Sequence, residues 1–331
     1  MPKRVLLHTQ FSTFSTYHAH GEAGLMIMQN PSLYNHILNK AIMLECNRRF
    51  LNGYTTPDIQ VSNSGIGGLP FVEHLLMPCK FLDGYVHTII RKMIDLGYYV
   101  AFTRVDDYYI PNKSWYKESH RLHDGIICGY DQEKKTYFFF SYDKNWVFRV
   151  FESPQSGFEK GILSAAKMGQ VSSIRAFKSS ADKVAFDPKS IISSLKEYLN
   201  NTFEKFPLNE SGIVRGIAVH DFLKIYINRI DEGIILHEHI DPRSFRMLWE
   251  HKKCMYDRIK ATENHFNADR LLSDEYQKIV TIADRARIMY AMYQKKERKD
   301  TLLKINECIS SIVEGEKSIL NKFIETFERM V

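Results

Sequence analysis

The sequence predicts an α+β domain with an antiparallel sheet over residues 1–155, followed by an α-helical domain over residues 156–331. Short apolar segments separated by polar connections dominate the first part of the chain, as is typical of strands. After residue 155, longer segments repeat their apolar residues at helical spacing. A length of 331 residues also allows two domains, since one domain usually has about 100–200 residues.

Two helices and two strands are expected in the first part of the chain. The run from Ser32 to Phe50 has apolar residues at helical spacing and follows Pro31, a residue that the start of a helix tolerates. A second amphipathic helix is expected over residues 84–96, and Gly97 is suited to end it. The shorter segments predict a strand at 4–9, a loop at 61–70 and a strand at 98–105.

Three further strands are expected between residues 125 and 152. The segments GIICGYD and TYFFFSYD flank the polar DQEKK, which has the composition of a hairpin connection. The segment WVFRVFE follows closely. Successive strands with short polar connections favour an antiparallel sheet.

Helical patterns account for the second predicted domain. The first of them begins at Asp187, a suitable N-cap, with Pro188 at the first helical position. The later segments each have an apolar face, which indicates a helical bundle or an antiparallel helical subdomain. They lie at 221–233, 241–266, 273–296 and from 301 to the C-terminus.

The overall charge and composition exclude several classes of protein. The net charge of +6 is mildly basic and its cations are interleaved with acids, so no nucleic-acid partner is expected. Five widely spaced cysteines without a CxxC pair argue against a disulfide framework and a cysteine-ligated zinc site. The N-terminus lacks the apolar core of a signal peptide, and no segment approaches the ~18 apolar residues of a membrane span. We therefore expect a cytoplasmic protein without a membrane partner.

The most informative motif runs from His123 to Asp143. His123 opens a predicted strand, and Asp143 ends the next one after a polar turn. Adjacent strand ends in a hairpin place two such side chains within hydrogen-bond reach. A carboxylate beside an imidazole holds its tautomer and orientation. The motif therefore predicts His123 as a catalytic histidine, with Asp143 as its orienting partner.

The run HDGIICGYDQEKKTYFFFSYD resembles the His–Asp half of the double-glycine peptidases that process bacteriocin leaders. It is more similar to the N-terminal domain of butirosin biosynthesis protein H and its relatives. Members of that family have a papain-like fold and transfer acyl groups from carrier proteins to amines. The segments YHAHGEAGLMIMQNPSLYNHIL, DDYYIPNKSWYKESHRLHDGIICGYD and SFRMLWEHKKCM resemble a branch of the family that accompanies nonribosomal peptide and polyketide assembly lines.

The resemblance implies a cysteine nucleophile at the start of the first helix, and the sequence departs from the family there. The matching segment contains Tyr17, His18 and His20 but no cysteine. Three explanations stay open: His18 or His20 serves as nucleophile or base, the domain is non-catalytic, or the cysteine has been replaced in this chain. Cys46, the first cysteine, falls on the apolar side of a predicted helix, where burial would suppress its thiolate.

Further polar residues are predicted to bind substrate at the mouth of the cleft. Two aspartates end a predicted strand, two tyrosines follow them, and two more polar residues flank the histidine pair near the N-terminus. These residues are Asp106, Asp107, Tyr108, Tyr109, Tyr17 and Glu22. The histidines at 18, 20, 120 and 123 also allow a metal site, but nothing completes a recognisable ligand pattern, so no metal is expected.

The function expected from the motif and the resemblance is acyl transfer or amide formation on a carrier-protein thioester in natural-product biosynthesis. The expected partners are an acyl or peptidyl carrier protein, or its synthetase, and a small-molecule amine. A 4'-phosphopantetheine arm would deliver the acyl group, and no other cofactor is expected. Two alternatives stay open: a non-catalytic pseudoenzyme that binds a carrier protein or synthetase, and a cysteine-type peptidase.

Overall fold

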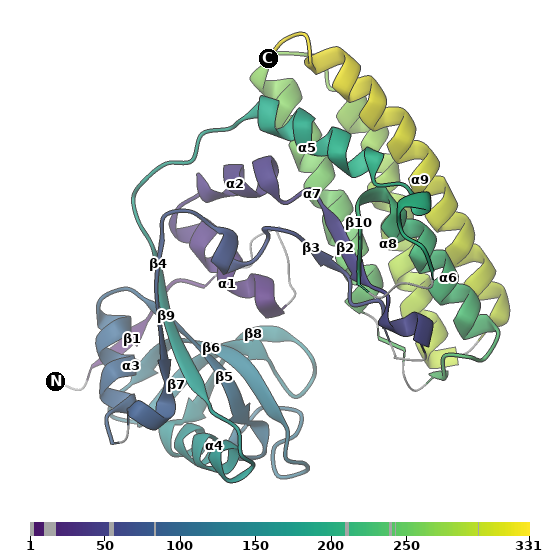
Figure 1. Cartoon of the computed structure of the whole chain (residues 1–331). Coiled ribbons are helices and arrows are strands. Elements are labelled where there is room, and N and C mark those ends of the chain that lie inside the picture. The colour runs from purple at the N-terminus through teal and green to yellow at the C-terminus, as the bar shows by residue number, and fades with distance from the viewer. Residues whose placement is uncertain are drawn as a thin grey trace. The chain divides into compact units, whose positions relative to one another are not determined.

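The protein forms two compact units, each built from two separate stretches of the chain (Figure 1). The first unit comprises Met1–Pro31 and Leu69–Lys183, and the second comprises Ser32–Gly68 and Val184–Val331. The computed structural model describes residues 3–9, 18–52, 56–82, 84–208, 212–237, 240–241, 243–296 and 298–331, without the side chains of residues 18–20, 52 and 299.

The first unit is built on a seven-stranded antiparallel sheet, so the predicted mixture of helices with an antiparallel sheet is confirmed. The strand order is β4-β9-β5-β6-β7-β8, and β1 pairs with the far end of β6. The strands are β1 (Arg4–Leu6), β4 (Val72–Pro78), β5 (Tyr99–Asp106), β6 (Leu122–Asp131), β7 (Thr136–Tyr142), β8 (Phe148–Pro154) and β9 (Ser173–Ser179).

The strands β6, β7 and β8 confirm the three successive antiparallel strands expected between residues 125 and 152. The boundary predicted after residue 155 instead lies inside the first unit. The chain continues there through α4 (Gln155–Lys167) and then adds β9 between β4 and β5. The pairing of β4 with β9 joins segments about a hundred residues apart. No local pattern in the sequence predicts this pairing.

Helices cover both faces of this sheet. On one face, α3 (Val86–Asp95) and α4 pack over an aromatic core that includes Phe102, Phe139 and Phe158. On the other face lies α1 (His18–Gln29), whose Gly21 passes so close that a Cβ there would lie 3.2 Å from the ring of Phe148. Gly97, at φ +83°, ends α3 as its sequence predicts.

One predicted helix is wrong in its second half. The segment from Ser32 forms α2 only over Leu33–Lys40, and Leu44–Asn47 is then strand β2. This strand pairs with β3 (Gln60–Val61) and β10 (Ile213–Arg215) in a small antiparallel sheet of the second unit. Pairing with a strand more than 160 residues away overrides the local helical spacing.

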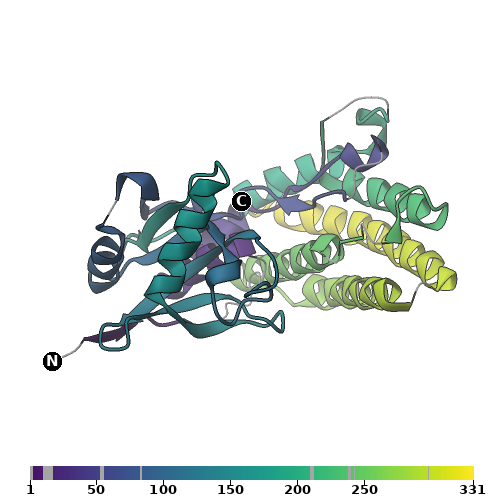
Figure 2. The same ribbon diagram turned by 90° about the horizontal axis from the view of Figure 1, so that it is seen from below.

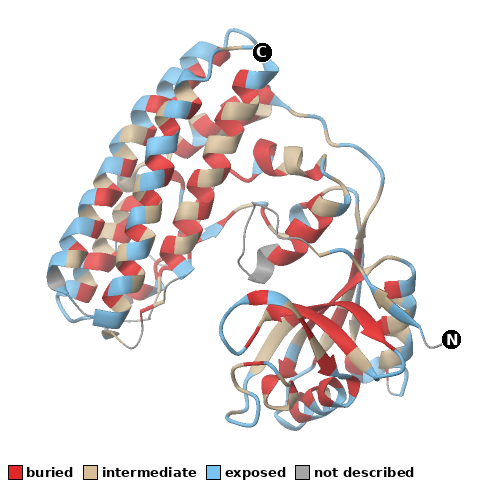
Figure 3. Ribbon diagram, turned by 180° about the vertical axis from the view of Figure 1, so that it is seen from behind, coloured by how far each residue is buried: buried red, intermediate tan, exposed pale blue. Residues whose placement is uncertain are grey.

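Long helices make up the rest of the second unit, as predicted from their apolar faces. In Figures 1 and 2, α7, α8 and α9 run lengthwise beside one another, and Figure 3 shows buried residues interspersed with exposed and intermediate ones along the long helices. Asp187 caps the first helix by accepting a hydrogen bond from the Ser190 amide at 3.1 Å. The helices are α5 (Pro188–Asn200), α6 (Val219–Asp231), α7 (Arg243–His265), α8 (Leu271–Lys296) and α9 (Lys299–Phe327).

The core of the second unit contains a buried carboxylate that joins its helices. Glu316 of α9 accepts hydrogen bonds from Lys252 Nζ of α7 and Tyr198 Oη of α5, both at 2.9 Å, and from Tyr276 of α8. His220 Nε2 of α6 lies 3.6 Å away. Burial alone would raise the pKa of Glu316, but the Lys252 ammonium outweighs it and lowers that pKa to about 2. Glu316 is therefore an anion at neutral pH.

The same helix α7 also holds the end of α2. Arg258, which is fully buried, donates to the last carbonyls of α2 and to the next one. A cation at a helix C-terminus satisfies carbonyls that the helix itself leaves unpaired. These carbonyls belong to Ile37, Leu38 and Ala41.

We expect Lys252→Met to lower the free energy of unfolding by about 3–5 kcal/mol, because it leaves Glu316 as a buried anion without its cation. The double variant Lys252→Met/Glu316→Gln should lose less than the sum of the two single changes. Chemical denaturation followed by circular dichroism measures both. Lys317→Met is the matched control, because Lys317 is exposed beside Glu316 on the same helix and should change stability by less than about 0.5 kcal/mol. A loss in K252M no larger than in K317M would contradict the assignment.

Acid should destabilise the second unit. Burial lowers the pKa of the His220 imidazole to about 3, far below the ordinary value of about 6.5. The unfolded chain therefore binds the proton first, and stability is lost as the pH falls below about 6.5, by up to ~1.4 kcal/mol per pH unit. Glu316 adds to this loss below its ordinary pKa of about 4.3. Unfolding curves at pH 7, 6 and 5 should have a smaller pH dependence in His220→Gln; an equal dependence would count against this explanation.

Candidate functional site

The candidate site lies where β5 ends beside the start of β6. The pairing of these strands shifts between Phe102 and Val105, and Arg104 takes a left-handed conformation, with φ +56°. Its amide donates to the carboxylate of Asp124 at 2.9 Å. Such a bulge re-aims the residues that follow it. Two consecutive aspartates, Asp106 and Asp107, come next, and both are buried.

The predicted catalytic histidine contacts the second of these aspartates. His123 Nδ1 lies 3.1 Å from Asp107 Oδ2. The side chain of Asp107 is 2% exposed, whereas that of His123 is 40% exposed. An imidazole with one nitrogen on a buried carboxylate and an accessible ring has the arrangement that general-base catalysis requires.

The partner predicted for His123 therefore needs correction. Asp143 is buried, but its carboxylate accepts hydrogen bonds from the amides of Asn145 and Val147 and from Arg149 Nε, at 2.6–3.0 Å. These bonds shape the turn between β7 and β8. An aspartate that ends a strand before a tight turn bonds readily to amides two to four residues on, so its position in the sequence fits both roles. The structure places Asp107, expected only to bind substrate, at the imidazole.

A buried lysine that the sequence did not reveal, Lys113, lies beside the Asp107 oxygen that does not contact His123. Lys113 is 2% exposed, and its Nζ lies 3.9 Å from Asp107 Oδ1. The same ammonium donates to Ser141 Oγ of β7 at 2.8 Å. Burial lowers the pKa of Lys113, and the nearby carboxylates of Asp107 and Asp124 oppose that shift. Lysine is seldom fully buried, so nothing in the run IPNKSW signals this position.

A second His–Asp pair lies beside the first. His120 Nδ1 is 2.7 Å from Asp106 Oδ2, and Ser164 Oγ of α4 donates to the same oxygen at 2.6 Å. The imidazole of His120 stacks on Tyr108, with ring centroids 4.3 Å apart, and Tyr109 contacts Tyr108 edge-on. Burial alone would raise the pKa of Asp106, but the hydrogen bonds from Ser164, His120 and the Tyr108 amide outweigh it and lower that pKa.

The approach of α4 that brings Ser164 to Asp106 depends on a glycine. A Cβ at Gly161 would lie 2.6 Å from Val105 Cγ1 and 3.1 Å from the Asp106 carbonyl oxygen. The lack of a side chain allows α4 to lie directly on the end of β5. Ser164 follows one turn later, which sets the hydroxyl over the carboxylate.

The N-terminal residues predicted for the site are only partly described. Tyr17 and the side chains of His18 and His20 lie outside the described residues. Glu22 of α1 is buried and forms an ion pair with the partly exposed Arg175 of β9. Burial raises the pKa of Glu22, against the opposing effect of Arg175.

The strand register places α1 and the residue opposite His123 on different faces of the sheet. On the face that α1 covers, a Cβ added at Gly21 would lie 3.8 Å from the side chain of Ile126. Val105, the cross-strand neighbour of His123, belongs instead to the core under α3 and α4.

None of the cysteines has the setting of a nucleophile. All five lie in described parts of the chain, and all are buried and unpaired. Burial raises the pKa of the Cys46 and Cys128 thiols to about 12 and that of Cys79 to about 11. Such thiols hold almost no thiolate at neutral pH.

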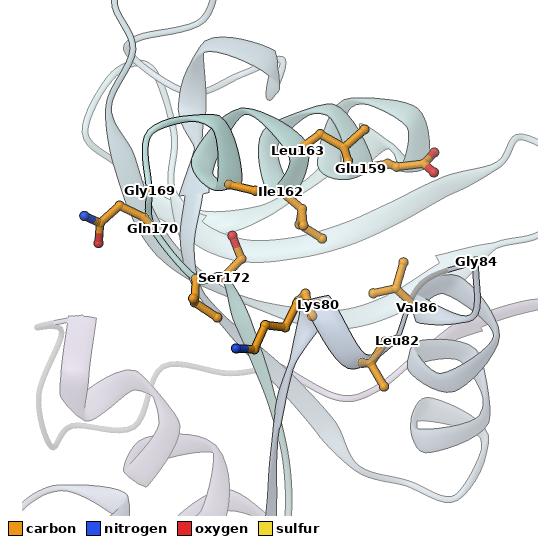
Figure 4. A pocket seen from close by; sticks show the side chains of 13 residues that line it. Lys80, Leu82, Gly84, Val86, Glu159, Ile162, Leu163, Gly169, Gln170 and Ser172 are labelled. Atoms are coloured by element: carbon orange, nitrogen blue, oxygen red, sulfur yellow. The ribbon is translucent and has the colours of Figure 1, made fainter.

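A cavity of about 440 Å³ lies beside the site, between α4 and the segment that enters α3 (Figure 4). Its walls combine the apolar side chains of Leu82, Val86, Ile162 and Leu163 with the polar side chains of Lys80, Glu159, Gln170 and Ser172. The helix α4 separates this cavity from the His–Asp pairs, because Leu163 lines the cavity while the adjacent Ser164 bonds to Asp106.

Comparisons with known proteins do not identify a family, so a function can be argued only from the residues of the site. No model of a known protein family matches the sequence, and no curated protein matches it. Within the described residues, no group of three or more His, Cys, Asp or Glu side chains is placed to bind a metal ion. No described helix is both long enough and apolar enough to cross a bilayer.

We expect Asp107→Asn to change the imidazole NMR signals of His123, because it removes the carboxylate at Nδ1. Asp143→Ala should leave those signals unchanged and lower the free energy of unfolding by about 1–3 kcal/mol, since the Asn145 and Val147 amides and Arg149 lose their common acceptor. Side-chain ¹H–¹⁵N spectra and denaturation curves measure both effects. The opposite result, with the His123 signals moving only in D143A, would restore the partner predicted from the sequence.

Proposed function

We propose that the protein transfers an acyl group from a thioester to an amine, with His123 as general base and Asp107 as the residue that orients it. The observation that carries the proposal is the contact between the half-exposed imidazole and the buried carboxylate at 3.1 Å. A His–carboxylate pair serves hydrolysis and acyl transfer alike. The resemblance to the butirosin biosynthesis protein H family favours transfer to an amine, in a domain of papain-like type.

The proposed reaction needs no protein nucleophile, because the acyl group arrives already activated as a thioester. The amine nitrogen attacks the thioester carbonyl carbon while its proton passes to His123 Nε2. The C–S bond then breaks, and the thiolate leaves with the proton that the imidazolium returns. The products are an amide and a free thiol. Holding the two substrates together and removing the proton at the right position can each supply a large rate factor.

The absence of an accessible thiol disfavours a cysteine peptidase. A peptide bond is a much poorer acyl donor than a thioester, so its cleavage by this route would require an activated nucleophile. The five buried cysteines do not supply one.

The resemblance also supplies the substrate class and setting of the proposal. The acyl donor would be a carrier protein with a 4'-phosphopantetheine thioester, and the acceptor a small amine of a nonribosomal peptide or polyketide pathway in the cytoplasm. The mild basic charge of +6 suits such a donor, since the arm contains a phosphodiester. No other cofactor is part of the proposal.

His123→Gln and Asp107→Asn should each lower kcat by at least about a hundredfold, because they remove the base or its orientation. The assay follows thiol release from pantetheine and carrier-protein acyl thioesters in the presence of primary amines, with amide formation confirmed by mass spectrometry. His74→Ala is the matched control, since His74 is an exposed histidine on the edge strand β4 and should leave the rate unchanged.

Two outcomes would contradict the proposal, one its mechanism and the other its enzymatic activity. Full activity in H123Q would exclude His123 as the base. Wild-type turnover at background, together with specific binding of a carrier protein, would identify the non-catalytic binding role instead. Resistance of the activity to thiol-alkylating reagents is expected, and inactivation by modification of a single cysteine would support the peptidase-like mechanism over the one proposed.

A further inference from the structure

The buried ammonium of Lys113 occupies a position that the proposed reaction does not yet explain. It lies in the segment between η4 (Asp107–Tyr109) and β6, and its side chain is 2% exposed. Taking an ammonium group out of water costs several kcal/mol unless a counter-charge compensates it. The only hydrogen bond of its Nζ within the described residues goes to Ser141 Oγ, which is uncharged. The compensating charge must therefore come from a nearby carboxylate.

Asp107 lies between this cation and the catalytic imidazole. Its Oδ2 lies 3.1 Å from His123 Nδ1, and its Oδ1 lies 3.9 Å from Lys113 Nζ. Oδ1 is buried and has no hydrogen-bond partner among the described residues. At 3.9 Å in a buried site, the two opposite charges attract strongly. One carboxylate is therefore attracted by a fixed cation on one side and by a titratable ring on the other.

Other charged or titratable groups near the imidazole come from β5, from β6 and from the segment between them. Asp124 follows His123 on β6, and its carboxylate accepts the Arg104 amide of β5. The Asp106–His120 pair lies beside Asp107, and its carboxylate is held mainly by Ser164 of α4 and by hydrogen bonds from amides. Among the described residues of the site, Lys113 is thus the buried cation that faces Asp107. The Asp106–His120 pair is held by other groups.

We propose that Lys113 is a positioning residue for His123: its buried ammonium fixes the ionised Asp107 carboxylate against the imidazole and thereby sets the pH range in which His123 can accept a proton. This inference rests on the proposed function for its catalytic consequence. With Lys113 present, its positive charge offsets part of the attraction of the Asp107 carboxylate for a proton on His123. Without it, the carboxylate favours the imidazolium, and the ring retains its proton to higher pH.

The test compares wild type, Lys113→Met and Lys117→Met. Lys117 belongs to the same segment but is exposed, so K117M removes an equal charge in water and serves as the matched control. In K113M, we expect the pH of half-protonation of the His123 ring, followed by ¹H–¹⁵N NMR, to rise by on the order of one pH unit. The acid limb of the pH–kcat profile should rise equally while KM stays within about twofold. In K117M neither should move by more than about 0.2 unit, because solvent screens an exposed charge.

The two readouts separate this inference from the proposed function. An NMR shift without thioester turnover in any variant would keep the role of Lys113 and reject the enzyme. Turnover with no difference between K113M and K117M would overturn the role of Lys113 and keep the enzyme. If K113M does not fold, Lys113→Gln retains a donor toward Ser141 and is predicted to produce the same upward shift. A folded K113Q without that shift would likewise overturn the inference.

Discussion

The first unit depends on one electrostatic constraint: two consecutive carboxylates are buried at the end of β5. Asp106 and Asp107 cannot be ionised there without compensation, and each is supported by different elements. Asp106 receives a hydroxyl from α4, an amide from its own turn, and an amide and an imidazole from the segment before β6. Asp107 has Lys113 and His123. The path of the chain from residue 106 to 123 follows from these requirements.

The second unit meets the same constraint with a single carboxylate. Glu316 accepts hydrogen bonds from a lysine and two tyrosines on three other helices, and all of these groups are buried. The contrast between the units is one of access. The imidazoles in the first unit remain about half exposed beside their buried carboxylates, whereas His220 is fully buried. In the second unit the buried charges join helices, whereas in the first unit they lie beside half-exposed imidazoles.

Local patterns predicted the elements whose contacts are close in sequence. The hairpins of β6 to β8, the end of α3 at Gly97 and the cap of α5 at Asp187 all depend on neighbours a few residues away. Pairings across a hundred residues or more, as for β2 and β9, were missed because no short window contains both partners. The position of His123 at the start of a strand was predictable from the sequence. Its partner was not, since Asp107 and Asp143 both end strands and only the fold decides which one reaches the ring.

The alternation of the chain between the units has a consequence for its synthesis. The chain enters the second unit at Ser32, returns to the first at Leu69 and leaves it again after Lys183. Strand β2 therefore emerges from the ribosome about 170 residues before its partner β10, and α2 emerges long before the Arg258 that caps it. The first unit can complete its sheet while this early segment still waits for its partners. A chain that stops at Lys183 would lack β10 and α7, so the apolar residues that these elements bury in that segment would be exposed and prone to aggregation.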